Sequence, residues 1–172
     1  EPWIERPDQF IDATFLEIAC GEAPYLVSRY NVVDGSTIAI DDRIGLLDRK
    51  LRIINQSVDD PIKWFSDARR AYQSIYGYEF QGDSLLIARV NLVMTFAEAV
   101  KRRWGREPAA KELRRIVNVV AWNVWQMDGL TGRLPFRRPR DEFEQISLLS
   151  LLDEAPPPQE NRQPFSRVYN WR

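Results

Sequence analysis

The stretch FLEIACGEAPYL, residues 15–26, most constrains what this chain can fold into. Its first half is apolar and rich in strand formers, its middle is the small-residue run 19–21, and an apolar pattern restarts at Tyr25. We expect a strand over residues 14–19, a tight turn, and a helix over residues 23–30. Small residues in such a turn let a ligand approach the backbone closely. An ordinary strand that ends in a glycine turn is the alternative.

The composition fits a single domain that lacks several kinds of chemistry. The 172 residues are 44% hydrophobic, which is enough for a core, and 24 Lys and Arg stand against 25 Asp and Glu. That balance argues against a protein that simply coats nucleic acid. The chain has no histidine and one cysteine, which removes Ser-His-Asp catalysis, an internal disulfide and the commonest metal ligand. We therefore expect no metal, and no apolar run is long enough to predict a membrane span.

Helical periodicity follows the opening stretch. An Asp-Gly turn predicts a hairpin over residues 31–42, and a helix is expected over residues 43–56. A second helix should begin with Asp60 as its cap and Pro61 in its first turn. We interpret residues 31–74 as an insertion after the first strand, although ordinary helices of a mixed domain fit as well. The stripes expected to be buried are Ile44, Leu47, Leu51 and Ile54, then Trp64, Phe65, Ala68 and Tyr72.

A second strand–helix unit begins at residues 75–80, IYGYEF. Aromatic and β-branched residues predict a strand that ends at Glu79. A long helix should run from about Asp83 to Trp104 and end at Gly105. Its buried face is predicted to centre on Leu86, Val90, Val93 and Ala97, widened by Leu85, Ile87 and Leu92.

A third unit and a change of composition complete the chain. A helix is expected from near Pro108 to residues 118–121, followed by a short strand that ends before Asp128. Prolines punctuate the sequence from residue 131 onward. We therefore predict a core domain over residues 1–130 and a partly extended Pro-rich segment over residues 131–172. Within that segment only residues 143–152 show a short amphipathic run. The apolar residues at helical spacing in the third helix are Leu113, Ile116, Val117 and Val120.

Three acids end the three predicted strands: Glu17, Glu79 and Asp128. In parallel α/β sheets, ligands bind beyond the carboxyl ends of the strands, so the three carboxylates are expected to form one rim. A carboxylate at a strand end can accept hydrogen bonds from two ribose hydroxyls. The alternative is that each acid is an ordinary exposed strand end.

Three motifs in this chain resemble those of adenine-specific DNA methyltransferases that use S-adenosylmethionine. FLEIACGEAPYL resembles the first motif, an acid-x-Ala-Cys-Gly turn followed by aromatic and Leu positions. Residues 75–94, IYGYEFQGDSLLIARVNLVM, resemble the second, and residues 123–130, NVWQMDGL, the third. Glu22 and Ala23 depart from the first motif. The residues that fall on cofactor-binding positions are Glu17, Ala19, Cys20, Gly21, Tyr25, Glu79, Phe80 and Asp128.

The resemblance implies a role for each acid and a fold for the chain. Glu79 would bind the ribose hydroxyls, Phe80 would pack on the adenine ring, and Asp128 would accept a hydrogen bond from the adenine amine. Glu17 would lie near the methionine ammonium. The implied fold is a partial Rossmann-like methyltransferase fold, with a parallel sheet flanked by helices and a helical insertion after the first strand.

The resemblance also implies an activity and partners. The chain would be the S-adenosylmethionine-binding part of an enzyme that methylates the exocyclic amine of adenine in a restriction–modification system. The implied partners are double-stranded DNA, through the full-length protein, and a restriction or specificity subunit in the bacterial cytoplasm. A non-catalytic DNA-contacting or protein-interaction module with the same fold is the alternative.

The motif that would hold the target base is missing. The family carries an Asn- or Asp-Pro-Pro-aromatic string, and the nearest string here, residues 155–158, lacks both the amide or acid and the aromatic. We therefore expect no catalytic residue in this chain and, because it opens on Glu1 rather than Met, a piece of a longer protein.

Two further features have less specific interpretations. Eleven Lys and Arg lie between residues 101 and 140; they predict either phosphate contacts or a solvated helix face. Cys20 has no histidine to activate it, so we expect a small buried packing residue and not a nucleophile. The basic residues assigned to nucleic-acid contact are Arg133, Arg137, Arg138 and Arg140.

Overall fold

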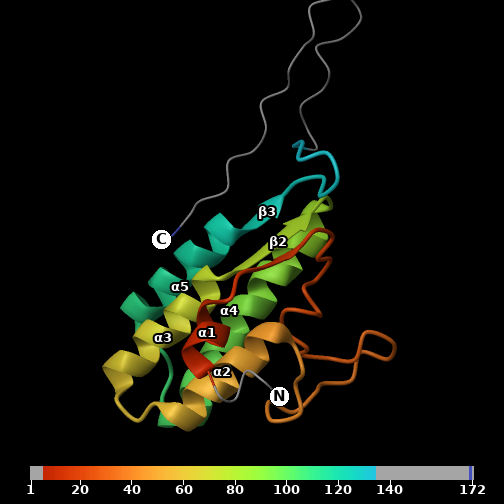
Figure 1. Cartoon of the computed structure of the whole chain (residues 1–172). Helices are drawn as coiled ribbons and strands as arrows, with labels where there is room; N and C mark the ends of the chain where they lie inside the picture. Colours follow the sequence, from red (N-terminus) through yellow and green to blue (C-terminus); the bar gives the residue numbers. More distant parts are fainter. Residues whose placement is uncertain (1–5, 135–170, 172) are drawn as a thin grey trace, which may run out of the picture.

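The computed structural model describes residues 6–134 and 171, which form a small parallel sheet with helices packed against one side (Figure 1). The strands lie in the order β1-β2-β3, and both neighbouring pairs are parallel. This confirms the predicted α/β class and the parallel sheet flanked by helices. The strands are β1 (Phe15–Glu17), β2 (Ile75–Glu79) and β3 (Val124–Gln126).

The helices between β1 and β2 match the sequence prediction closely. They are α2 (Leu46–Ser57) and α3 (Pro61–Gln73), and a short helix α1 (Pro7–Asp12) precedes β1. Asp60 caps α3 as predicted, because its side chain accepts a hydrogen bond of 2.7 Å from the Lys63 backbone N–H. The buried residues of the two predicted stripes are Leu47, Leu51, Ile54, Trp64, Ala68 and Tyr72, with Phe65 partly buried against them.

The predicted burial of Ile44 is wrong, since this residue is 78% exposed. It precedes α2, whose first residue is Leu46. The backbone N–H groups of Ile44 and Gly45 donate to the Ser28 hydroxyl at 2.7 and 3.0 Å. These bonds fix the entry to the helix and leave the Ile44 side chain on the surface.

The predicted helix over residues 23–30 is wrong, and the predicted hairpin is reduced to one antiparallel bridge between Tyr30 and Thr37. Ala23 has a φ of 66°, a left-handed conformation from which a right-handed helix cannot continue. The segment is instead made of turns. It is fastened to α4 by side chains, including a bond of 3.0 Å from the Asn91 amide to the Glu22 carbonyl.

The two helices between β2 and β3 are α4 (Gly82–Trp104) and α5 (Ala110–Asn123). Gly105 ends α4 as predicted, and its backbone has the left-handed conformation. The predicted centre of the buried face is wrong, because Leu86 and Val90 are 63% and 50% exposed. Of the apolar residues at helical spacing in α5, Ile116 and Val120 are buried and Val117 is exposed. The apolar residues that α4 buries are Leu85, Ala88, Leu92, Phe96, Ala99 and Val100.

The helix of the third strand–helix unit ends later than predicted. Helix α5 continues to Asn123, past the predicted end at residues 118–121, and β3 follows at once. The Asn123 amide donates to the backbone carbonyls of Tyr72 and Ile75 at 3.1 and 2.8 Å. These bonds join the end of α5 to the start of β2. The short strand before Asp128 is confirmed.

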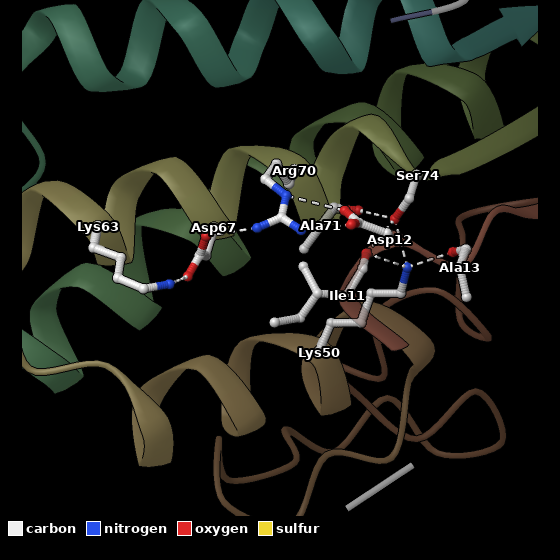
Figure 2. Close-up of polar contacts among 9 residues, drawn as sticks. All are labelled: Ile11, Asp12, Ala13, Lys50, Lys63, Asp67, Arg70, Ala71 and Ser74. Atoms are coloured by element: carbon white, nitrogen blue, oxygen red, sulfur yellow. Dashed lines mark hydrogen bonds and ion pairs between the residues drawn. The ribbon is translucent and has the colours of Figure 1, made fainter. Parts of the chain in front are cut away.

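A buried polar cluster joins α1, α2 and α3 (Figure 2). Lys50 of α2 is fully buried, and its ammonium donates to the carbonyls of Ile11 and Ala13 at 3.0 and 2.7 Å and to the Ser74 hydroxyl at 2.5 Å. Beside it, Arg70 of α3 bonds the Asp12 carboxylate. The cluster fixes the segment that leads into β1, and it thereby positions the first strand against β2.

Most of the Pro-rich segment 131–172, with its amphipathic run 143–152, lies outside the described residues. The domain boundary at residue 130 stays a prediction.

Candidate functional site

A pocket of about 420 Å³ lies beyond the carboxyl ends of the three strands. Ligands bind at this edge in open α/β sheets, and a volume of roughly 300–1,000 Å³ is typical of small-molecule sites. The pocket unites the turns that follow β1, β2 and β3, which are far apart in the sequence. Its lining residues are Ile18, Ala19, Glu79, Phe80, Met127, Asp128, Gly129 and Leu130.

Close backbone contacts between the turns shape this pocket. A Cβ atom at Gly129 would lie 1.8 Å from the Ile18 carbonyl oxygen, so only glycine allows the turns after β1 and β3 to meet. The Cys20 N–H donates to the Tyr78 carbonyl, and the Met127 N–H donates to the Glu79 carbonyl, each at 2.9 Å. The three turns therefore form one connected rim.

Glu79 is the central side chain of the rim. Its Oε2 accepts a hydrogen bond of 2.8 Å from the Gly21 N–H, and its Oε1 accepts one of 2.8 Å from the Gln81 N–H. Gly21 has a φ of 53°, which favours glycine and aims its N–H at the carboxylate. An ionised carboxylate offers about four acceptor positions. Glu79 can therefore hold the turn and still accept hydrogen bonds from a ligand.

Glu17, the last residue of β1, has a partly buried carboxyl group with a raised pKa. Its Oε2 atom is buried and has no hydrogen-bond partner among the residues that the structure describes. Burial raises the pKa of Glu17 to about 7. Glu17 is paired in register with Gly77 of β2 but is not among the residues that line the pocket. A buried, unpartnered carboxyl group favours a cationic ligand group, because a positive charge would offset its desolvation.

Cys20 is a packing residue. It is buried, and its Sγ atom would lie 3.0 Å from a Cβ at Gly77, so the thiol fills the space that this glycine leaves. Burial and the nearby Glu17 and Glu79 carboxylates raise the pKa of the Cys20 thiol to about 12. The thiol stays protonated at neutral pH and cannot act as a nucleophile.

Asp128 and Phe80 also line the pocket. The Asp128 Oδ1 atom accepts hydrogen bonds from the Leu130 and Thr131 N–H groups at 2.9 and 3.2 Å. These bonds hold the pKa of Asp128 below its usual range, so the carboxylate is ionised. Phe80 is 53% exposed, and its ring offers a flat apolar surface to the pocket.

Some of the predicted cofactor-binding residues line the pocket and others do not. Ala19, Glu79, Phe80 and Asp128 line the pocket, and Gly21 bonds one of them. Tyr25 is 79% exposed and does not line it, because the helix predicted after the first turn does not form. The lining residues that sequence reasoning missed are Ile18, Met127, Gly129 and Leu130, each adjacent to a residue or turn that it had selected.

Several basic residues expected near DNA are paired with acids. Ion pairs of 2.6–2.9 Å join Arg102 to Asp41 and Arg103 to Asp59. Arg133 is exposed. Phosphate contact stays a prediction, and three of the residues assigned to it lie outside the described residues: Arg137, Arg138 and Arg140.

Comparisons with protein-family models, curated proteins and solved structures find no match for this chain. Within residues 6–134 and 171, no group of three or more Cys, Asp or Glu side chains is placed to hold a metal ion. None of the helices in the same ranges is long and apolar enough to cross a membrane. The pocket at the carboxyl edge of the sheet is therefore the feature of this chain that indicates a function.

Proposed function

We propose that this chain binds S-adenosylmethionine and is the cofactor-binding part of an adenine-specific DNA methyltransferase. One observation carries the proposal: a single pocket at the carboxyl edge of a parallel sheet brings together Glu79, Phe80 and Asp128 from two different strand ends. These are the residues to which the sequence resemblance gives the ribose and adenine contacts.

The residues present fit the chemistry of this cofactor. The ribose hydroxyls need an acceptor at a strand end, which Glu79 supplies with its remaining lone pairs. The adenine ring needs an apolar surface and an acceptor for its amine, which Phe80 and the ionised Asp128 supply. The sequence resemblance assigns the methionine ammonium to Glu17, which does not line the pocket but holds a buried carboxyl oxygen without a partner among the described residues.

In this proposal the chain holds and orients the methyl donor. The cofactor supplies the reactive methyl group when it is bound, and the protein supplies binding and charge placement. Glu79 and Asp128 would hold the two ends of the adenosine. The hydrogen bond from the Gly21 N–H to Glu79 joins the turn that follows Glu17 to the end of β2. The group that would present the target adenine is not among the candidate residues of this chain, so the transfer step requires a further part of the parent enzyme.

Isothermal titration calorimetry with S-adenosylmethionine tests the proposal. We expect saturable binding by the full chain and a loss of roughly 1–3 kcal/mol, about 5- to 150-fold in Kd, for Phe80→Ala and for Glu79→Ala. Glu107→Gln, a surface substitution outside the pocket, is the matched control and should leave the Kd unchanged. Because Glu79 also holds the Gly21 turn, far-UV circular dichroism and Tm are recorded for each variant.

Two results would contradict this proposal. One is the absence of binding heat from a chain with a cooperative melting transition. The other is binding that neither Phe80→Ala nor Glu79→Ala weakens, which would place the ligand outside the pocket.

A further inference from the structure

Glu22 and Ala23, the two residues that depart from the first motif, lie in the turn that follows β1. The same turn carries Gly21, whose N–H donates to the Glu79 carboxylate at 2.8 Å. Ala23 is fully buried and has a φ of 66°, a conformation that residues other than glycine rarely adopt. A residue persists in such a conformation only where the surrounding contacts fix it. The contacts made by this turn therefore help to decide where the Gly21 N–H points.

Three side chains supply contacts of this kind, and we call Glu22, Tyr30 and Asn91 the Tyr30 cluster. The Asn91 amide donates to the Glu22 backbone carbonyl at 3.0 Å and to the Tyr30 hydroxyl at 3.2 Å. The Tyr30 hydroxyl in turn donates to the Glu22 carboxylate. Asn91 is buried, and burial together with the bond to Glu22 raises the pKa of Tyr30, so its hydroxyl remains a donor at neutral pH. The cluster thus holds both the backbone and the side chain of the residue that follows Gly21.

The Tyr30 cluster completes a closed series of contacts around the rim. Asn91 lies on α4, and this helix begins at Gly82, shortly after Glu79. The cluster joins the helix to the turn, and the Gly21 N–H joins the turn back to Glu79. A closed series restricts each of its members, because none can move unless one of the contacts opens. The orientation of the Glu79 carboxylate therefore depends on side chains that are not among the residues lining the pocket.

We propose that Tyr30 and Asn91 are positioning residues for the Glu79 carboxylate. They hold the turn after β1 so that its Gly21 N–H fixes the carboxylate in the orientation that a ligand meets. Without them the ligand would have to order both the carboxylate and the turn, so its affinity would fall although no direct contact is lost. This inference rests on the proposed function for the identity of the ligand, whereas the effect on Gly21 can be measured without a ligand.

Hydrogen exchange of the Gly21 amide, followed by NMR without ligand or denaturant, tests the positioning directly. Tyr30→Phe removes the hydroxyl from the cluster, and we expect the Gly21 amide to exchange about 3- to 10-fold faster, the effect of losing roughly one hydrogen bond. The matched control is Tyr72→Phe, because the buried Tyr72 hydroxyl donates to the Leu92 carbonyl of the same helix at 2.8 Å. This control should lower the Tm and leave the exchange of Gly21 close to that of the natural chain. Equal exchange of Gly21 in the Tyr30→Phe variant and the control would overturn the assignment.

Calorimetric titration with S-adenosylmethionine measures the consequence for binding. Tyr30→Phe and Asn91→Ala should each raise the Kd by about 3- to 10-fold, whereas Tyr72→Phe should leave it unchanged even where its Tm is equally low. If the natural chain binds and neither cluster variant weakens binding, the positioning role is wrong. If the natural chain itself does not bind, the proposed function fails, and the exchange of Gly21 still decides whether the Tyr30 cluster holds the turn.

Discussion

At the scale of single residues, the candidate site depends on carboxylates whose surroundings differ. Asp128 and Glu79 accept hydrogen bonds from backbone N–H groups, and these bonds lower the pKa of Asp128. Glu17 has a buried oxygen without such a partner among the described residues, and its pKa rises to about 7. A group with a raised folded-state pKa stabilises the protein below its unfolded pKa, and that stability is lost as the pH rises towards the folded value.

This sign gives a prediction for Glu17→Gln. At pH 8 the natural side chain is ionised and its burial is costly, whereas glutamine is neutral. At pH 5 the natural carboxyl is protonated in the folded state, so most of this cost is absent and the two chains should differ much less in stability. The Tm of the variant should therefore exceed that of the natural chain by about 2–4 °C at pH 8, for roughly 1 kcal/mol after discounting for partial exposure. Differential scanning fluorimetry at both pH values measures this, and an equal difference at pH 5 and pH 8 would contradict it.

At the scale of elements, the sequence predicted existence and order better than orientation. Capping at Asp60 and the left-handed Gly105 were predictable, because each depends on local chemistry. The buried face of α4 was not, because this helix is apolar nearly all round and its periodicity does not select one side. The turns of residues 23–30, predicted as a helix, were missed because contacts with distant side chains of α4 decide them.

The orientation of α4 can be tested by a matched pair of truncations. Leu92 is fully buried in the core, and Leu86 lies on the same helix with 63% of its surface exposed. Leu92→Ala removes buried methyl groups and leaves a cavity, so it should cost about 2–5 kcal/mol of unfolding free energy. Leu86→Ala should stay within about 0.5 kcal/mol of the natural chain. Urea unfolding followed by circular dichroism measures both, and a larger loss for Leu86→Ala would mean that the predicted face is the buried one after all.

At the scale of the whole molecule, the described residues form one small parallel sheet whose carboxyl edge carries the pocket. The site could be located from sequence because three strand ends carry acids, and parallel strands bring their carboxyl ends to one edge. The role of Gly129 could not, because it depends on how closely the turn after β3 approaches Ile18. The shape of the rim is thus set by contacts between turns that are distant in the sequence.

A ligand in this pocket should therefore stabilise the molecule as a unit. It would contact turns that follow all three strands, and it binds only when those turns are assembled. With free S-adenosylmethionine at about 100 times its Kd, binding adds about 2.7 kcal/mol to the unfolding free energy, or roughly 5–10 °C in Tm. Gly129→Ala should abolish most of this shift, because a methyl group there meets the Ile18 carbonyl and separates two of the turns. A full shift in Gly129→Ala, with the natural chain behaving as expected, would show that the ligand stabilises the protein from a site that does not need the assembled rim.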